Sequence, residues 1–164
     1  MNTYFRRLLL IAIILSSSVG CDQVTKETAK NHLSHTGPLS YLGDTFRLQY
    51  TQNIGAFLSI GSSLPEKVRF WLLIVLTLIA VIGMLIFLLL LRNPRPSLVV
   101  GLSFIIGGGV GNLIDRIFHH GAVTDFMNVG IGDLRTGIFN VADMAIMLGI
   151  GMLIFIGSQR KDEY

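Results

Sequence analysis

Charged residues and cysteine are scarce in this sequence. Only 14% of its 164 residues are charged, whereas 51% are hydrophobic, and the mean hydropathy is +0.63. This composition excludes an ordinary soluble domain and indicates one integral-membrane domain over residues 1–164. The single cysteine, Cys21, excludes an internal disulfide framework. The net charge of +3 is modest and the basic residues form no stripe suited to nucleic acid, so we interpret them as flanks of membrane segments.

Most of the hydrophobic residues lie in four apolar segments. Residues 70–91 carry no charge and are long enough to cross a hydrocarbon core about 30 Å thick. In the last segment, Asp143 is the only charged residue. The sequence therefore predicts an all-α membrane protein with four transmembrane helices, at about residues 8–28, 70–91, 97–116 and 138–157.

The first apolar segment has a second interpretation. Two arginines near the N-terminus, the uncharged residues 8–21 and the small residues before Cys21 also fit a removable signal peptide. The run that ends at Cys21 resembles a lipoprotein processing site, although Ser18 stands where leucine is usual. We favour a transmembrane helix that continues through residues 22–26, because three more apolar segments follow.

The longest polar stretch, residues 31–67, lies between the first two predicted helices. Within it, residues 46–51 alternate apolar and polar side chains, the period of a half-buried strand, and Gly43 with Asp44 signals a preceding turn. We predict a small antiparallel β-sheet on the membrane surface between helices 1 and 2. The alternative is a connecting loop, which is also what we predict for residues 119–137.

Basic residues near the helix ends predict the orientation in the membrane. The tight turn at residues 92–96 carries two arginines, and both termini are basic. The opposite side carries slightly more basic residues, but they are spread over a long segment and mixed with acidic ones. Because basic residues in short loops favour the cytoplasm, we predict both termini there. The residues assigned to this side are Arg6, Arg7, Arg92, Arg95, Arg160 and Lys161.

This topology brings several carboxyl groups to one membrane depth. Asp22 and Asp115 lie near the outer ends of the first and third helices, Asp143 lies in the first turns of the fourth, and Asp125 lies in the loop between. An aspartate at the centre of a membrane helix costs about 2.5–3.5 kcal/mol on insertion scales. Several such groups close together therefore indicate a functional site rather than a stabilising one.

Residues 107–116 combine four glycines with an amide, a carboxylate and a guanidinium. Small residues let membrane helices approach closely. If the helix continues, Asn112, Asp115 and Arg116 share one face, which must look into the protein or a wet cavity. The alternative is a helix cap with an Asp115–Arg116 ion pair.

Two neighbouring carboxyl groups can activate water for attack on a peptide bond. Like charges about 3 Å apart cannot both ionise, so one group keeps its proton near neutral pH. The ionised group then accepts a proton from water while the neutral one donates to the carbonyl oxygen. The spacing of these residues in the sequence allows either Asp115 or Asp125 to be the partner of Asp143. We favour Asp125, because Arg116 next to Asp115 would hold that carboxyl group ionised.

Three other interpretations use the same residues. A proton-coupled transporter also needs membrane aspartates, but the inner halves of all four segments are uncharged, so no polar path crosses the bilayer. A membrane scaffold would need no paired aspartates. A metal site would have to use His119, His120, Asp125 and Asp133, and adjacent histidines lack the usual ligand spacing. We therefore expect neither a metal nor another cofactor.

Five blocks of the sequence, in order, resemble the motifs of the bacterial lipoprotein signal peptidases, also called signal peptidase II. Two departures occur: Phe57 stands where a second alanine is usual, and Thr124 where a second valine is usual. The blocks are DQVTK at 22–26, NIGAFLS at 53–59, GGVGNLIDR at 108–116, VTDF at 123–126 and FNVAD at 139–143.

The resemblance implies an aspartyl endopeptidase of the bacterial inner membrane, with its site on the extracytoplasmic side under a short helix. Its substrates would be prolipoproteins, cut just before a cysteine that bears diacylglycerol. Asp125 and Asp143 fall at the catalytic pair. We further expect a monomer that contacts membrane lipid and no nucleic acid. Positions implied around the pair or the substrate are Asp22, Lys26, Asn53, Gly55, Asn112, Asp115, Arg116 and Asn140.

Overall fold

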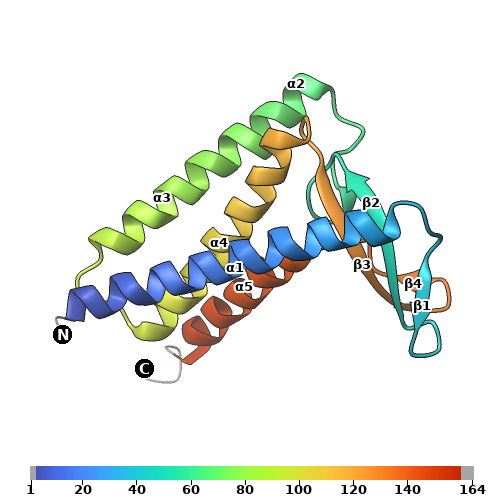
Figure 1. Cartoon of the computed structure of the whole chain (residues 1–164). Helices are drawn as coiled ribbons and strands as arrows, with labels where there is room; N and C mark the ends of the chain where they lie inside the picture. Colours follow the sequence, from blue (N-terminus) through green and yellow to red (C-terminus); the bar gives the residue numbers. More distant parts are fainter. Residues whose placement is uncertain (1–2, 160–164) are drawn as a thin grey trace.

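Four helices of the computed structural model, which describes residues 3–159, are long and apolar enough to cross a membrane. This confirms the four predicted spans (Figure 1). The second span is built from three consecutive pieces, of which the middle one, η2, is a π-helix. Arg160 and Lys161, which we assigned to the cytoplasm, lie outside the described residues. The helices are α1 (Thr3–Leu33), α2 (Glu66–Arg69), η2 (Phe70–Leu76), α3 (Thr77–Leu90), α4 (Pro96–Phe118) and α5 (Val141–Gln159).

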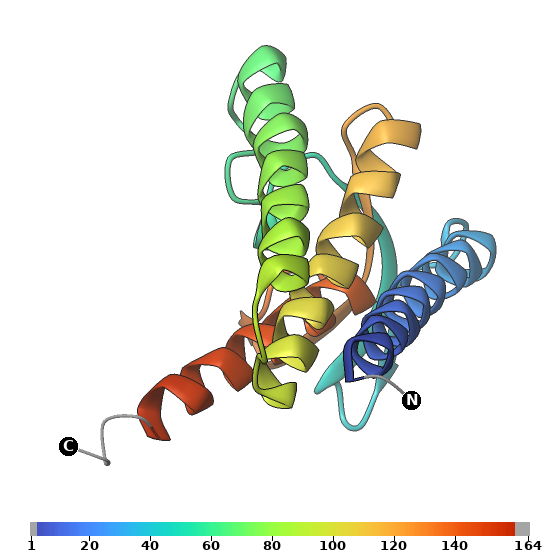
Figure 2. The ribbon, with the colours of Figure 1, turned by 90° about the vertical axis from the view of Figure 1, so that its left-hand side faces the viewer.

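Helix α4 is the centre of the helical bundle, with α1, α3 and α5 packed around it (Figure 2). Two glycines of α4 make this close approach possible. A Cβ at Gly108 would collide with the backbone of Ala142 in α5, and one at Gly111 would lie 2.6 Å from a carboxylate oxygen of Asp22 in α1. The small residues of the predicted segment 107–116 therefore bring three helices together near their acidic residues.

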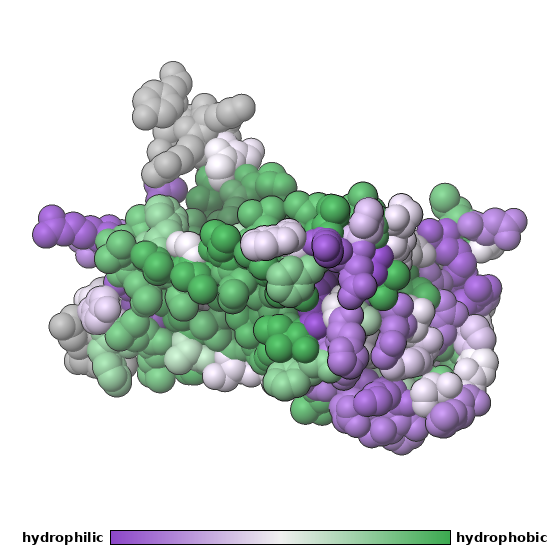
Figure 3. All heavy atoms as spheres, turned by 90° about the horizontal axis from the view of Figure 1, so that it is seen from above, coloured by the Kyte–Doolittle hydropathy of each residue, from purple (hydrophilic) through white to green (hydrophobic). Residues whose placement is uncertain are grey.

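The apolar surface of the bundle and the polar surface of the sheet lie at different ends of the molecule. Hydrophobic side chains cover the helical part, and hydrophilic side chains gather over the end that carries the strands (Figure 3). Exposed apolar residues occur along α1, α3 and α5, as in Ile13, Phe87 and Ile154. Such surfaces are stable in contact with lipid rather than water.

The sheet is antiparallel and has the strand order β1-β2-β3-β4. The predicted strand at residues 46–51 is confirmed, since it lies in β2. However, the sheet is not confined to the segment between helices 1 and 2, because β3 and β4 come from residues 119–137, which we predicted to be a loop. The strands are β1 (Leu39–Tyr41), β2 (Phe46–Asn53), β3 (Val123–Ile131) and β4 (Leu134–Arg135).

Pairing of β2 with β3 carries polar residues of distant segments to the same place. Thr51 lies opposite Asp125, and Asn53 lies opposite Val123. Phe126 packs on the last turns of α1, against Ala29 and Leu33, and this contact holds the sheet against the bundle. The sheet therefore places Asp125 at the ends of the helices.

Helix α5 begins at Val141, three residues later than predicted. Phe139 is paired with Met127 of β3, so the chain is still extended there. Asp143 consequently lies in the first turn of α5 and not about 8 Å below its start, as the predicted helix from residue 138 implied. The acidic group lies nearer the helix end than expected.

Candidate active site

Four buried aspartates from four different elements meet where the sheet joins the bundle. Their exposed fractions are 0% for Asp22 of α1, 2% for Asp115 of α4, 1% for Asp125 of β3 and 8% for Asp143 of α5. The predicted convergence of these groups is therefore present in the structure. Buried charges of one sign require compensating hydrogen bonds and cations, and the surrounding residues divide the four aspartates into two pairs with different partners.

Asp125 accepts hydrogen bonds from two amide side chains. Asn53 Nδ2 lies 2.9 Å from Asp125 Oδ2, and Asn140 Nδ2 donates to Asp125 Oδ1. Burial raises the pKa of Asp125 to about 6; the hydrogen bonds from Asn53 and Asn140 oppose this rise, and the negative charge of Asp143 adds to it. This carboxyl group can therefore exchange a proton near neutral pH.

Asp143 is held by Asn112 and by the start of its own helix. Asn112 Nδ2 donates to Asp143 Oδ1 over 2.9 Å. The backbone N–H of Asn140 donates to Asp143 Oδ2 at 3.2 Å, and the N–H of Asp143 donates to Asn140 Oδ1 at 2.9 Å. This reciprocal exchange has the form of a capping box, which explains why α5 begins here.

Asn140 connects the two carboxyl groups. Its side-chain nitrogen bonds Asp125 while its backbone nitrogen bonds Asp143. Within residues 3–159 no hydrogen bond joins Asp125 directly to Asp143. The pair is therefore bridged by an amide residue, and each carboxyl group keeps an orientation fixed by N–H donors.

Asp22 and Asp115 form the second pair, and Lys26 lies between them. Lys26 Nζ is 2.7 Å from Asp22 Oδ2 and 3.2 Å from Asp115 Oδ2. Lys26 is itself only 4% exposed, so its positive charge stabilises both carboxyl groups away from solvent. A third bond runs from Lys26 Nζ to Asn112 Oδ1 at 3.0 Å and links this cluster to Asp143.

Asp115 also fixes the start of strand β3. The backbone N–H of Thr124 donates to Asp115 Oδ2 at 2.8 Å, and Gln23 Nε2 donates to Asp115 Oδ1 at 3.0 Å. The cation in contact with Asp115 is Lys26, and the described residues contain no Asp115–Arg116 ion pair. The alternative of such a pair was wrong, because consecutive helical residues do not face each other.

Asn112, Asp115 and Arg116 are all buried, as their shared helical face predicted. Arg116 Nη2 donates to the carbonyl of Gly55 at 3.0 Å, while the N–H of Gly55 donates to Asn53 Oδ1 at 2.8 Å. This connects the turn after β2 to the end of α4.

A cavity of about 350 Å³ lies beside Arg116, between α4 and the start of the second span. Its apolar walls include Ile54, Phe70 and Leu73. Its charged lining residues are Arg69, Arg116 and Glu66. The 3-10 helix η1 (Phe57–Ser59) follows the Gly55 turn directly.

Three contacts of the site have no signal in the sequence. Gln23 follows Asp22, but nothing in its spacing predicts a bond to Asp115. The backbone N–H groups of Thr124 and Ala142 bind Asp115 and Asp22, and backbone donors are the same for every residue type. Among the described residues no three His, Cys, Asp or Glu side chains are grouped as metal ligands.

Comparison with known proteins identifies the family of this chain. The chain matches the family described as signal peptidase (SPase) II over residues 13–158. The lipoprotein signal peptidase of Brevibacillus brevis is 36% identical over 145 residues, covering 88% of this chain and 90% of the relative. That of Syntrophotalea carbinolica is 38% identical over 153 residues, covering 92% and 89%. A bacterial membrane enzyme solved by the in meso method at 2.3 Å resolution has a TM-score of 0.79 and 25% identity, covering 93% of this chain and 90% of that one.

The bundle, the sheet and the buried carboxyl groups define a helical membrane hydrolase of the aspartic peptidase class. The chain belongs to the signal peptidase II family.

Proposed function

We propose that this chain removes the signal peptide from prolipoproteins by cutting just before a diacylglyceryl-modified cysteine, with Asp125 and Asp143 as its catalytic pair. The observation that carries this assignment is the difference in partners between the four aspartates. Lys26 forms ion pairs with Asp22 and Asp115, whereas within residues 3–159 Asp125 and Asp143 accept hydrogen bonds only from N–H donors of neutral residues. A pair without a bound cation is free to take up and release a proton.

The chemistry is hydrolysis of one peptide bond. The ionised member of the pair accepts a proton from water, whose oxygen attacks the carbonyl carbon of the scissile bond. The protonated member donates to the carbonyl oxygen and stabilises the tetrahedral intermediate. When the C–N bond breaks, the departing nitrogen takes a proton from the carboxyl group that received one from water. As the C=O bond forms again, the hydroxyl group made from the carbonyl oxygen returns its proton to the other carboxyl group, which restores the pair. A pKa of about 6 suits Asp125 to either role near neutral pH.

The neighbouring residues position the pair and the substrate. Asn53, Asn112 and Asn140 orient the two carboxyl groups through N–H donors. Asp22, Lys26 and Asp115 hold Asn112 and strand β3 in place. We assign the cavity beside Arg116 to the substrate segment next to the scissile bond, since its apolar walls suit a signal peptide or an acyl chain. The residues with these supporting roles are Asp22, Lys26, Asn53, Gly55, Asn112, Asp115, Arg116 and Asn140.

The proposed orientation places the sheet and the carboxyl groups on the extracytoplasmic side of the bacterial inner membrane. Arg6, Arg7, Arg92 and Arg95 lie at the other end of the bundle, which supports a cytoplasmic location for that end. We expect one chain to be sufficient, because every residue of the site comes from the same chain. We also expect residues 1–164 to act as a single domain in contact with lipid.

Cleavage of a defined substrate tests the function. The purified chain in detergent is mixed with a prolipoprotein peptide whose cysteine carries diacylglycerol and, separately, with the same peptide bearing free cysteine. We expect products cut on the N-terminal side of the modified cysteine, identified by mass, and no cut in the free-cysteine peptide. Equal cleavage of both peptides, or cleavage at another bond, would contradict the proposed specificity.

A further inference from the structure

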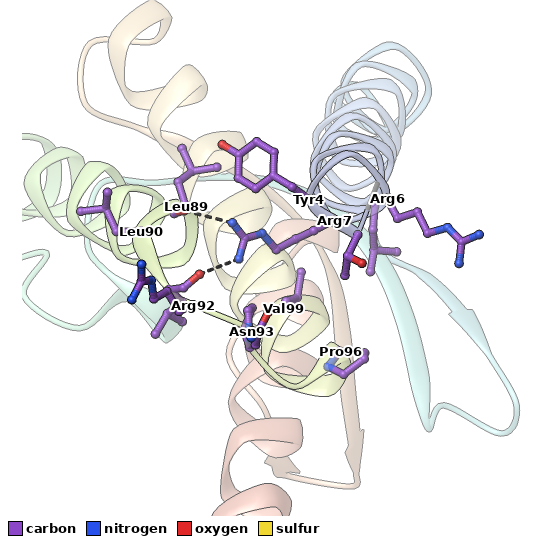
Figure 4. Close-up of a pocket in the computed structure, with 13 residues that line it drawn as sticks. Tyr4, Arg6, Arg7, Leu89, Leu90, Arg92, Asn93, Pro96 and Val99 are labelled. Carbon is purple, nitrogen blue, oxygen red and sulfur yellow. Dashed lines mark hydrogen bonds between the residues drawn. The ribbon is translucent and has the colours of Figure 1, made fainter. Parts of the chain in front are cut away.

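A second cavity, of about 740 Å³, lies at the end of the bundle away from the carboxyl groups. It is formed by the first turns of α1, the last residues of α3, the connecting residues 91–94 and the start of α4 (Figure 4). On α1, fifteen residues separate Arg7 from Asp22, or about 22 Å of helix. This cavity is therefore separate from the candidate active site, and the reaction leaves it without a role.

The charge of this cavity has one sign. Of the residues that the structure describes, three arginines and no acidic residue line it. The guanidinium groups of Arg7 and Arg92 lie on the same side of α1, whereas the Arg6 side chain extends away from them (Figure 4). A concave surface whose charged lining residues are all arginines attracts an anion and repels a cation. The positive end of the α4 dipole, beginning at Pro96, adds to this preference.

Only part of the donor capacity of these arginines is used. Arg7 Nη1 and Nη2 donate to the carbonyls of Leu91 and Leu89 at 2.7 and 3.1 Å, and its guanidinium stacks on Tyr4 with 4.9 Å to the ring centroid. These contacts explain Arg7 as a cap for the carbonyls at the end of α3. They leave Arg7 Nε buried and without a partner among the described residues, and they assign nothing to Arg6 or Arg92.

The walls of the cavity are apolar where they continue toward the membrane interior. Leu10 of α1, Leu89 and Leu90 of α3 and Val99 of α4 line it. Beyond it, α1 exposes Ile13 and α3 exposes Phe87. A ligand that fits this arrangement carries an anionic head for the arginines and apolar chains for the helices. A free anion would contact only the arginines and leave the apolar walls without a ligand.

We propose that this cavity binds the phosphate headgroup of one anionic glycerophospholipid, with its acyl chains along α1 and α3. Basic pockets between transmembrane helices bind such headgroups. The bound lipid would join the start of α1 to the connection between α3 and α4, which otherwise meet there through Arg7. The site is independent of the peptidase reaction and of its assignment to particular aspartates.

Native mass spectrometry of the full chain in detergent tests the proposal, with dioleoyl phosphatidylglycerol and dioleoyl phosphatidylcholine as probes. We expect one phosphatidylglycerol adduct at least about tenfold tighter than the phosphatidylcholine adduct. The double substitution Arg6→Gln and Arg92→Gln, which spares the Arg7 contacts, should weaken it about 30-fold, the factor expected for two interfacial arginines. Arg95→Gln is the matched control, because Arg95 belongs to the same turn but does not line the cavity.

Three results would overturn the proposal. Equal binding of the two lipids by the unmodified protein would show no preference for an anionic head, and this comparison stands even if the double variant fails to fold. An equal loss in Arg95→Gln would show general attraction to a basic surface. Displacement of the lipid by inorganic phosphate at equal concentration would show a site for a free anion.

Discussion

Lys26 Nζ donates to Asn112 Oδ1 across 3.0 Å, and the other end of the same amide donates to Asp143 over 2.9 Å. The amide of Asn112 has one acceptor end and one donor end, so a cation bound to its oxygen turns its nitrogen toward Asp143. The charge cluster of α1 and α4 thereby acts on the orientation of a proposed catalytic carboxyl group.

The first prediction concerns Lys26. Lys26→Met should lower the free energy of unfolding by about 3–5 kcal/mol, because Asp22 and Asp115 would remain buried without their cation. Thermal unfolding in detergent measures the loss. In the protein that remains folded, the pH profile of cleavage should shift, which loss of stability alone would not cause. Lys30→Met, an exposed change on the same helix, serves as the control, and equal effects of both substitutions would refute a specific role for Lys26.

The second prediction separates Asp115 from the proposed pair. Asp115→Asn removes a negative charge that binds Lys26 and a carboxylate oxygen that accepts from the Thr124 N–H. We expect a lower melting temperature and reduced yield, with measurable cleavage in the folded fraction. A stable Asp115→Asn protein without any turnover would show that Asp115 takes part in the chemistry.

The third prediction concerns pH and Asp125. Its pKa is raised from 3.8 to about 6 in the folded protein, so folding favours the protonated form. The stabilising contribution is complete below about pH 4 and is lost as the pH rises through 6. The melting temperature of the unmodified protein minus that of Asp125→Asn should therefore fall between pH 4 and pH 7.5. A difference that stays constant over this range would show that Asp125 is not perturbed.

The fourth prediction concerns Cys21. Cys21 is exposed on the surface of α1, which is one continuous helix through Asp22 and Lys26. Cys21→Ala should keep most of the activity, and the intact mass should correspond to an uncleaved N-terminus without lipid. A mature chain that begins at a lipid-modified Cys21 would contradict the continuous helix.

The fifth prediction concerns orientation. Reporter fusions after Arg95 and after Tyr164 should report the cytoplasm, and a fusion in the loop near Gly43 should report the opposite side. We expect this orientation because the arginines at one end of the bundle favour the cytoplasm, and the sheet lies at the opposite end. A cytoplasmic signal near Gly43 would reverse the proposed side of the active site.

The helices and β2 could be predicted because their residue patterns are local. Long uncharged segments indicate spans, and the alternation in residues 46–51 indicates a strand. Strand β3 could not be predicted this way, because Val123, Thr124 and Asp125 are consecutive and all buried. A strand covered on both faces lacks the alternation that identifies a half-buried one.

Most site residues, and the choice of Asp125 as the partner of Asp143, could be proposed from the sequence, but the contacts of Lys26 with Asp22, Asp115 and Asn112 could not. The bond between Lys26 and Asn112 joins residues far apart in the chain, and no spacing encodes it. The partner of Asp115 also depends on how α1 packs against α4. The late start of α5 follows from the reciprocal bonds of Asn140 and Asp143, and an Asn-Val-Ala-Asp run differs from the usual Ser/Thr and Glu form of that motif.

Turnover of two single variants tests the central claim most directly. Asp125→Asn and Asp143→Asn are purified and assayed for cleavage of the diacylglyceryl-modified peptide, beside Asp133→Asn, an exposed aspartate in the turn between β3 and β4. Loss of an acid–base group predicts turnover reduced by about 10²–10⁴-fold in the first two, in proteins that remain folded. Asp133→Asn should retain normal turnover. A folded Asp125→Asn or Asp143→Asn enzyme with near-normal turnover would contradict the assignment of this pair.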